Sequence, residues 1–279
     1  MNVRRNILVV LVLLGLLSPQ CAIGEEKPLW ELGIGAGILR MPDYRGSDES
    51  RYYVLPYPYL IYRGGILKID ERRISGQLFK TDRVLLDISG YGSVPVKSSS
   101  NSARAGMPDL DPTFEIGPAL RIKLLESNAD GYKLSMALPL RAFFSTDFSS
   151  VRHEGWVFSP RLNLEKNNLI PETGLKLGIS AGPMFADNSY NAYFYTVEQA
   201  YARATRPAYS AGGGYCGSTL TVGLNKAYKQ LIFHAFVSAD FLHGAVFEES
   251  PLVKTRTSVM SGFSVSWLFA KSAKTVTSD

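Results

Sequence analysis

The sequence predicts a β-barrel that crosses the outer membrane of a Gram-negative bacterium. Three observations favour this fold class: an N-terminal export signal, long segments in which apolar and polar residues alternate, and aromatic residues near the ends of those segments. The predicted architecture is all-β, a transmembrane antiparallel up-and-down barrel, with about twelve strands favoured and about ten possible.

The N-terminus has the pattern of a cleaved secretory signal peptide. Arg4 and Arg5 precede the apolar run Ile7 to Leu17, and small residues follow it, so cleavage is predicted between Gly24 and Glu25. The apolar run is shorter than the roughly 20 residues that a membrane-spanning helix needs. We therefore expect export rather than an anchor.

The rest of the chain predicts a single domain. The expected organisation is a signal peptide at residues 1–24, one barrel domain at 25–270 and a tail at 271–279. Loss of Arg4 and Arg5 with the leader lowers the formal net charge from +5 to +3, which is too mild to favour a nucleic-acid partner. Cys21 leaves with the leader, and the lone Cys216 excludes an intrachain disulfide without revealing a role of its own.

Alternation of apolar and polar residues is the main structural signal. In residues 262–269, GFSVSWLF, apolar Phe263, Val265 and Trp267 alternate with Gly and Ser. A period of two residues indicates a strand with one apolar face. The same pattern recurs at Trp30–Ile38, Phe114–Leu124, Tyr132–Phe144, Trp156–Glu165, Leu175–Phe185, Ser218–Leu224 and Leu231–Phe241.

Strand length separates a membrane barrel from a soluble sandwich. Sandwich strands usually have about five or six residues, whereas these segments approach the roughly nine to eleven of a tilted membrane strand. Aromatic residues near segment ends suit the two membrane interfaces. They are Trp30, Tyr52, Tyr53, Trp156 and Trp267. We therefore expect the apolar faces to contact outer-membrane lipid.

Parity of the connections fixes the expected strand number. Four long irregular connections should lie outside the cell, with short turns on the periplasmic side. They are Pro42–Ser50, Lys97–Asp111, Ala186–Pro207 and Gly244–Thr257. The strand number is even if Ile66–Asp70 and Arg73–Phe79 are separate strands, which gives a barrel of about twelve strands. It is also even if they merge with rearrangement, which gives about ten strands. The run of serines followed by Asn, Gly and Pro predicts that Lys97–Asp111 is mobile.

No residue pattern predicts catalysis, a metal site or a cofactor. His234 shares a strand face with Ser238 and Asp240, but His234 and Ser238 would lie roughly 13 Å apart along the strand, beyond hydrogen-bond reach. His153 and His243 have no cysteine or carboxylate beside them at metal-ligand spacing. We therefore predict a protein that is not an enzyme.

Charged residues on the polar strand faces are the candidate functional residues. They are Arg121, Lys123, Lys133, Arg141, Arg161 and Lys176 with Glu115, Glu165 and Asp240. Two interpretations stay open. These charges either fill a narrow lumen with ion pairs, or they line a pore with a mild preference for anions.

Several stretches resemble one family of outer-membrane proteins. Residues 44–48, YRGSD, and the proline-spaced residues 56–63, PYPYLIYR, are similar to the first hairpin of the MipA/OmpV family, the MltA-interacting proteins. Residues 201–214, 244–245 and 249–253 resemble the second half of that family. The resemblance implies a non-catalytic scaffold that links a murein-degrading lytic transglycosylase to a bifunctional penicillin-binding protein. Other relatives imply an osmotic-response or adhesion role.

Overall fold

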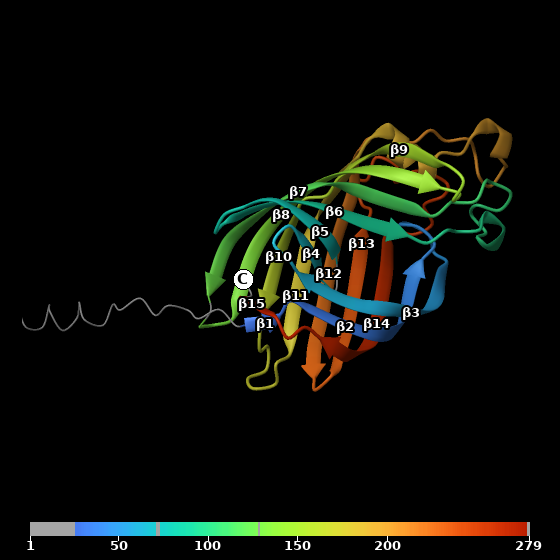
Figure 1. The fold of residues 1–279 in the computed structure, drawn as a ribbon. Helices are drawn as coiled ribbons and strands as arrows, with labels where there is room; N and C mark the ends of the chain where they lie inside the picture. The colour runs from blue at the N-terminus through green and yellow to red at the C-terminus, as the bar shows by residue number, and fades with distance from the viewer. Residues whose placement is uncertain (1–25, 71–72, 128, 278–279) are drawn as a thin grey trace, which may run out of the picture.

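A computed structural model describes residues 26–70, 73–127 and 129–277. The predicted signal peptide and its cleavage point between Gly24 and Glu25 lie outside the described residues. The main sheet is antiparallel throughout and closes on itself, because its first and last long strands, Trp30–Pro42 and Thr257–Lys271, pair with each other (Figure 1). In the described part of the chain, no helix is both long and apolar enough to cross a membrane.

The barrel has twelve strand positions, as the sequence favours. β9 and β10 both lie between β8 and β11, so they form one position that is interrupted at Ser159 and Pro160. The strands are β2 (Trp30–Pro42), β3 (Ser50–Arg63), β4 (Leu67–Asp70), β5 (Arg73–Lys80), β6 (Val84–Ser93), β7 (Thr113–Ser127), β8 (Tyr132–Thr146), β9 (Val151–Phe158), β10 (Arg161–Lys166), β11 (Lys176–Ala186), β12 (Gly214–Tyr228), β13 (Leu231–Phe241) and β14 (Thr257–Lys271). The separation of β4 from β5 supplies the parity that the sequence requires.

The two faces of each strand differ as a membrane barrel requires. On β14, the side chains of Phe263 and Trp267 are about half exposed on the outer surface, whereas Ser266 is buried inside. On the inner face of the wall, the Ser266 hydroxyl lies 2.8 Å from the Tyr57 hydroxyl of β3. Position 35 has no room for a larger residue than glycine, because a Cβ there would lie 2.5 Å from the Tyr57 ring. Large apolar side chains therefore face lipid, and small or polar ones share the crowded interior.

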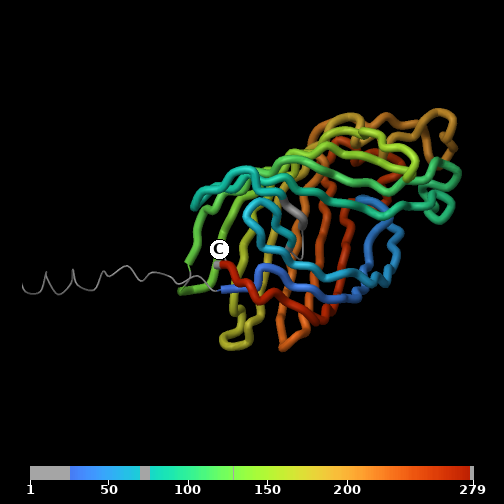
Figure 2. The backbone as a smooth tube through the Cα atoms, viewed as in Figure 1, coloured from blue at the N-terminus to red at the C-terminus, as the bar shows by residue number. Residues whose placement is uncertain are grey.

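The two ends of the barrel have different structures, as the tube in Figure 2 shows. Short connections and the first and last described residues, Glu26 and Thr277, lie at one end, which we call the short-turn end. There β1 (Glu26–Pro28) pairs with β15 (Thr275–Thr277), so part of the predicted tail at 271–279 adds a small sheet below the barrel. The short turns of outer-membrane barrels face the periplasm.

Long loops pack together over the opposite end. We call residues 43–49, 94–112, 187–213 and 242–256 the cap. They contribute most of the main hydrophobic cluster, including the fully buried Leu242, Phe247 and Leu252. The ring of Tyr195 stacks on Phe247 with centroids 3.6 Å apart. The largest apolar core of the protein therefore lies in its loops.

Hydrogen bonds between loops lock the cap. The buried Arg104 donates to Ser98 Oγ at 3.2 Å and to the Phe194 carbonyl at 3.1 Å. The Asn101 amide donates to Asp43 Oδ2 at 2.9 Å. Residues Lys97–Asp111, which composition predicts to be mobile, are therefore packed into the cap. Their serines and Asn101 satisfy partners inside the cap, which sequence composition alone does not reveal.

The cap also contains a helix that the alternation pattern misses. Helix α2 (Asn188–Tyr195) begins at Asp187, whose side chain accepts a hydrogen bond from the Tyr190 amide at 2.9 Å. Single 3₁₀ turns occur at Ser98–Ser100 and Gln199–Tyr201. The aromatic sequence NSYNAYFY has weak helix propensity, so the N-cap and the surrounding packing determine its conformation.

Candidate functional site in the lumen

Charged side chains gather in the lumen below the cap. Arg45 comes from the cap, Glu115 from β7, Arg141 from β8, Arg161 from β10 and Asp240 from β13. We call these five residues the upper cluster. Arg45 Nε lies 3.1 Å from Asp240 Oδ1, and Arg141 Nη1 lies 3.5 Å from Glu115 Oε2. All three arginines act electrostatically on Glu115, so the two ion pairs and Arg161 form one group.

The upper cluster has more positive charge and more donors than it uses. Its three guanidinium groups face two carboxylates. Among the described residues, Arg45 Nη2 and Arg141 Nε are buried without a hydrogen-bond acceptor, and Arg161 makes no ion pair. A buried donor without an acceptor costs about 1 to 3 kcal/mol. The cluster is therefore suited to an anionic or strongly accepting group.

The other predicted lumen charges lie nearer the short-turn end. Arg121 Nε is 2.9 Å from the buried Asp87, and Lys123 is 2.6 Å from Glu126. Lys133 stands opposite Glu165 in the register of β8 and β10, and Lys176 stands opposite Asn225. The structure thus brings Glu115, Arg141, Arg161 and Asp240 together and leaves the other five predicted residues apart from them.

Sequence reasoning missed two members of the site region, Arg45 and Tyr91. Arg45 belongs to a loop, and alternation gives no direction for loop side chains. Tyr91 follows the inward residues Asp87 and Ser89 at a period of two, so the same pattern was available to find it. Glu115, Arg161, Asp240 and Arg141 all act electrostatically on Tyr91.

The residues that suggested a hydrolase have other partners. The Ser238 hydroxyl lies 2.8 Å from Thr221 Oγ1, and Asp240 Oδ1 accepts a hydrogen bond from Thr219 at 2.6 Å. Within the described ranges, no three His, Cys, Asp or Glu side chains are placed to hold a metal ion. Cys216 is buried, and its Sγ lies 3.2 Å from Asn191 Oδ1.

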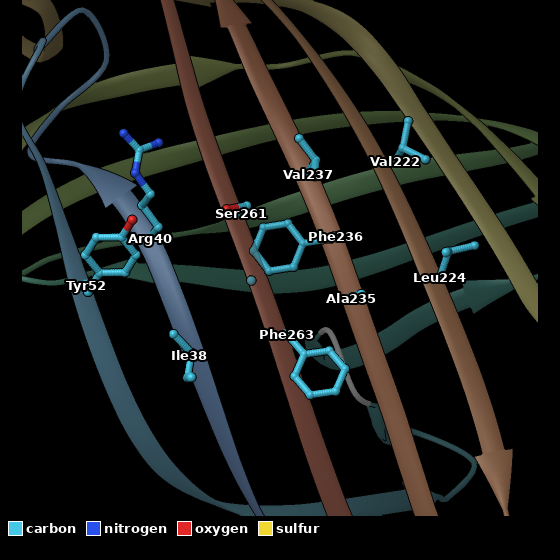
Figure 3. Close-up of a pocket in the computed structure, with 11 residues that line it drawn as sticks. Ile38, Arg40, Tyr52, Val222, Leu224, Ala235, Phe236, Val237, Ser261 and Phe263 are labelled. Carbon is cyan, nitrogen blue, oxygen red and sulfur yellow. The ribbon is translucent and has the colours of Figure 1, made fainter.

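A shallow groove of about 550 Å³ lies on the outer wall across β2, β3 and β12 to β14 (Figure 3). Figure 3 shows its labelled side chains, mostly apolar, with Arg40 and Tyr52 at one side. The lining residues are Ile38, Arg40, Tyr52, Val222, Leu224, Ala235, Phe236, Val237, Ser261, Gly262 and Phe263. The groove therefore belongs to the apolar face of the barrel, which contacts lipid.

Comparison with protein families gives a decisive match. The family model described as MltA-interacting protein MipA matches residues 34–269, which is nearly the whole barrel. The chain belongs to the MipA family. This MipA-family chain is an outer-membrane β-barrel protein, and its outward apolar faces contact lipid. A search of curated protein sequences finds no match.

A search of solved structures finds chains with partial similarity to this one. A bacterial polysaccharide outer membrane secretin has 8% identity and a TM-score of 0.43, covering 87% of this chain and 99% of that one. An outer membrane channel from Pseudomonas putida F1 has 11% identity and a TM-score of 0.42, covering 90% and 100%. The Escherichia coli outer membrane phospholipase A has 12% identity and a TM-score of 0.37, covering 90% and 93%.

Proposed function

We propose that this MipA-family barrel is a non-enzymatic scaffold that holds cell-wall enzymes at the periplasmic face of the outer membrane. The family match over residues 34–269 carries the proposal, because that family is described as MltA-interacting. The partners expected from the family resemblance are a lytic transglycosylase and a bifunctional penicillin-binding protein. The packed cap favours contacts at the other end of the barrel.

The short-turn end offers exposed cations to such partners. Its exposed cations are Lys80, Arg83, Lys176, Lys229, Lys271 and Lys274, which we call the basic rim. The exposed carboxylates among the described residues at this end are Glu26, Asp82, Glu126, Asp130, Glu165 and Glu172, so the basic rim lies within a surface of mixed charge. Complementary charge speeds association and selects partners. The basic rim therefore suits a periplasmic enzyme with an acidic surface.

Charge reversal at the basic rim tests the scaffold. The variant carries Arg83→Glu and Lys229→Glu, and the matched control carries Arg203→Glu and Lys254→Glu, which are exposed on the cap. In affinity purification from solubilised envelopes, the parent and the cap variant should retain murein enzymes and the rim variant should lose them. Equal recovery from rim and cap variants would exclude the rim, and absence of murein enzymes from the parent would refute the scaffold.

The alternative is a narrow pore with a mild preference for anions. The excess of arginine in the upper cluster favours it, whereas the cap packed over the long-loop end opposes it. In planar bilayers a pore should conduct, and its anion preference should fall when Arg141 and Arg161 become Glu. Osmotic-response or adhesion roles, also implied by the resemblance, would instead use the exposed surface of the cap.

A further inference from the structure

One part of the barrel wall is incomplete. β3 pairs with β2 along its whole length, but among the described residues it pairs with β4 only at Tyr62 and Arg63. β4 is four residues long and turns back at once, since Asp70 stands opposite Arg73 of β5. β3 makes no ladder with β6. Among the described residues, no strand therefore neighbours one edge of residues 50–58, and Figure 1 shows β3 and β6 running apart beyond the short β4 and β5.

The backbone pattern shows which groups point to this open edge. Arg63 N donates to the Leu29 carbonyl, and Asp43 N donates to the Glu49 carbonyl, so odd-numbered residues bond toward β2. Even-numbered residues of β3 must then direct their backbone groups to the open edge. Pro56 and Pro58 are both even-numbered and have no N–H to leave unpaired. The sequence of β3 is therefore suited to a free edge at this place.

The opening has a complete frame, which we call the lateral window. Residues 50–58 of β3 form one side, and residues 90–93 of β6, which lack a β5 partner, form the other. The paired strands β4 and β5 lie at the bottom. The cap closes the top, because Arg51 donates to the Ser100 carbonyl at 2.7 Å and the Ser102 amide donates to Glu49 at 2.6 Å.

The window is apolar outside and polar inside. Tyr52 and Val54 on its outer side are 73% and 72% exposed. On the β6 side the outward positions are Gly90 and Gly92, and a Cβ at Gly92 would meet no heavy atom closer than 3.6 Å. Tyr91 faces inward and is an electrostatic neighbour of Arg161. The window thus joins the lipid face to the upper cluster.

We propose that the lateral window admits a single-chain amphiphile with an anionic headgroup from the outer membrane into the lumen. The carboxylate or phosphate of its headgroup pairs with Arg161, where the upper cluster has spare positive charge and spare donors. Its acyl chain lies through the window against Tyr52 and Val54. A bare strand edge is costly in hydrocarbon, and a cap over the long-loop end leaves the side as the route for a membrane-borne ligand.

Amide hydrogen exchange tests the free edge directly. In phosphatidylcholine nanodiscs, the amides of Tyr52 and Val54 should exchange at least about tenfold faster than those of Tyr53 and Leu55, which bond to β2. Equal protection of the two pairs would show that the wall is closed, and the proposal would fail.

Photocrosslinking tests the ligand. The probe is a long-chain fatty acid with a diazirine on its chain, added to the full mature chain in phosphatidylcholine nanodiscs, and crosslinked peptides are identified by mass spectrometry. We expect adducts at residues 50–58 and 90–93. Excess palmitate should compete and hexadecanol, which lacks the charge, should not. Competition by lysophosphatidate as well would indicate recognition of any anionic head, whereas competition by lysophosphatidate alone would assign phospholipid as the source.

Two variants and a control complete the experiment. Arg161→Gln should weaken labelling about tenfold, as expected for loss of a charge-assisted hydrogen bond. Gly92→Trp should block the window, and Gly76→Trp, on β5 below it with open space around its Cβ, should not. Heat-modifiability on gels checks folding of each variant. Unchanged labelling of a folded Gly92→Trp barrel, or competition by hexadecanol equal to that by palmitate, would overturn the proposal.

Discussion

Individual side chains in this barrel are sorted by the medium that each strand face meets. Val265 on β14 points outward between neighbours Phe233 and Ala36, while Ser264 beside it points inward. The arginines of the lumen mostly lie beside carboxylates, as Arg63 does with Glu31 at 2.7 Å. An unpaired charge in hydrocarbon is unfavourable. A charged residue on the outer face should therefore lower the free energy of unfolding more when it lies deeper in the bilayer.

The first prediction uses that depth dependence. Val265→Arg should lower the free energy of unfolding by roughly 2 to 4 kcal/mol if the residue lies near the bilayer midplane, and Val259→Arg, nearer the cap on the same face, by roughly 0 to 1 kcal/mol. The measurement is folding in lipid vesicles against urea. A larger loss for Val259→Arg would show that the membrane position of β14 is wrong.

The second prediction concerns the guanidinium fork of Arg104. Burial lowers the pKa of Arg104, yet its guanidinium donates to Ser98 Oγ and to the carbonyls of Phe194 and Pro108. Arg104→Lys should loosen the cap by about 2 to 3 kcal/mol, because one ammonium cannot replace the fork. Limited proteolysis should cut loop 94–112 faster. Arg256→Lys, an exposed substitution on the cap surface, is the control and should leave cutting unchanged.

At the scale of elements, short pieces of structure depend on single caps and pairings. Asp187 both caps α2 and accepts the Trp156 amide at 3.0 Å, so one carboxylate joins the helix to β9. The shortness of β4 has a comparable effect, because among the described residues β4 pairs with β3 only at Tyr62 and Arg63.

The third prediction is about α2. Asp187→Ala should destabilise the folded protein by about 1 to 2 kcal/mol, since it removes the N-cap and leaves the Trp156 amide without its acceptor. Asp187→Asn keeps an acceptor oxygen and should cost less than half as much. Urea unfolding followed by tryptophan fluorescence measures both. Equal losses would indicate that the charge of Asp187, rather than its hydrogen bonds, stabilises the element.

At the scale of the whole molecule, the cap and the barrel are built by different forces. Apart from the lateral window, the barrel wall is held by a ladder of backbone hydrogen bonds between strands that face lipid, whereas the cap is a packed apolar core with buried phenols. Tyr44 donates to the Leu252 carbonyl at 2.8 Å, and Tyr195 donates to the Arg45 carbonyl at 2.9 Å. These bonds require protonated hydroxyl groups.

The fourth prediction follows from those phenols. Burial raises the pKa of Tyr193 to about 12 and also raises the pKa values of Tyr44 and Tyr195. A pKa raised in the folded state gives stability that is complete below the ordinary tyrosine pKa of about 10 and is lost as pH rises toward the folded value. The cap should therefore open between about pH 10 and 12 while the barrel wall persists. Tyrosinate absorbance and proteolysis of the cap measure this. A cap that stays protease-resistant after all tyrosines ionise would contradict it.

The sequence by itself determined the barrel and the favoured strand number. Alternation with a period of two predicts which face of a strand contacts lipid and which faces the lumen, because each side chain must meet one or the other. The family resemblance likewise rests on residues 44–48 and 56–63 as they stand in the chain.

Only the tertiary structure decided the cap, the upper cluster and the lateral window. The composition of loop 94–112 predicts mobility, because its serine, glycine and proline residues show no alternation of apolar and polar side chains. In the structure, contacts with other loops bury several of its residues. Arg45 meets Asp240 across 195 residues of chain, a distance that no local pattern spans. The window exists because β4 is too short to pair with all of β3, and pairing between strands is a property of the closed sheet rather than of either strand alone.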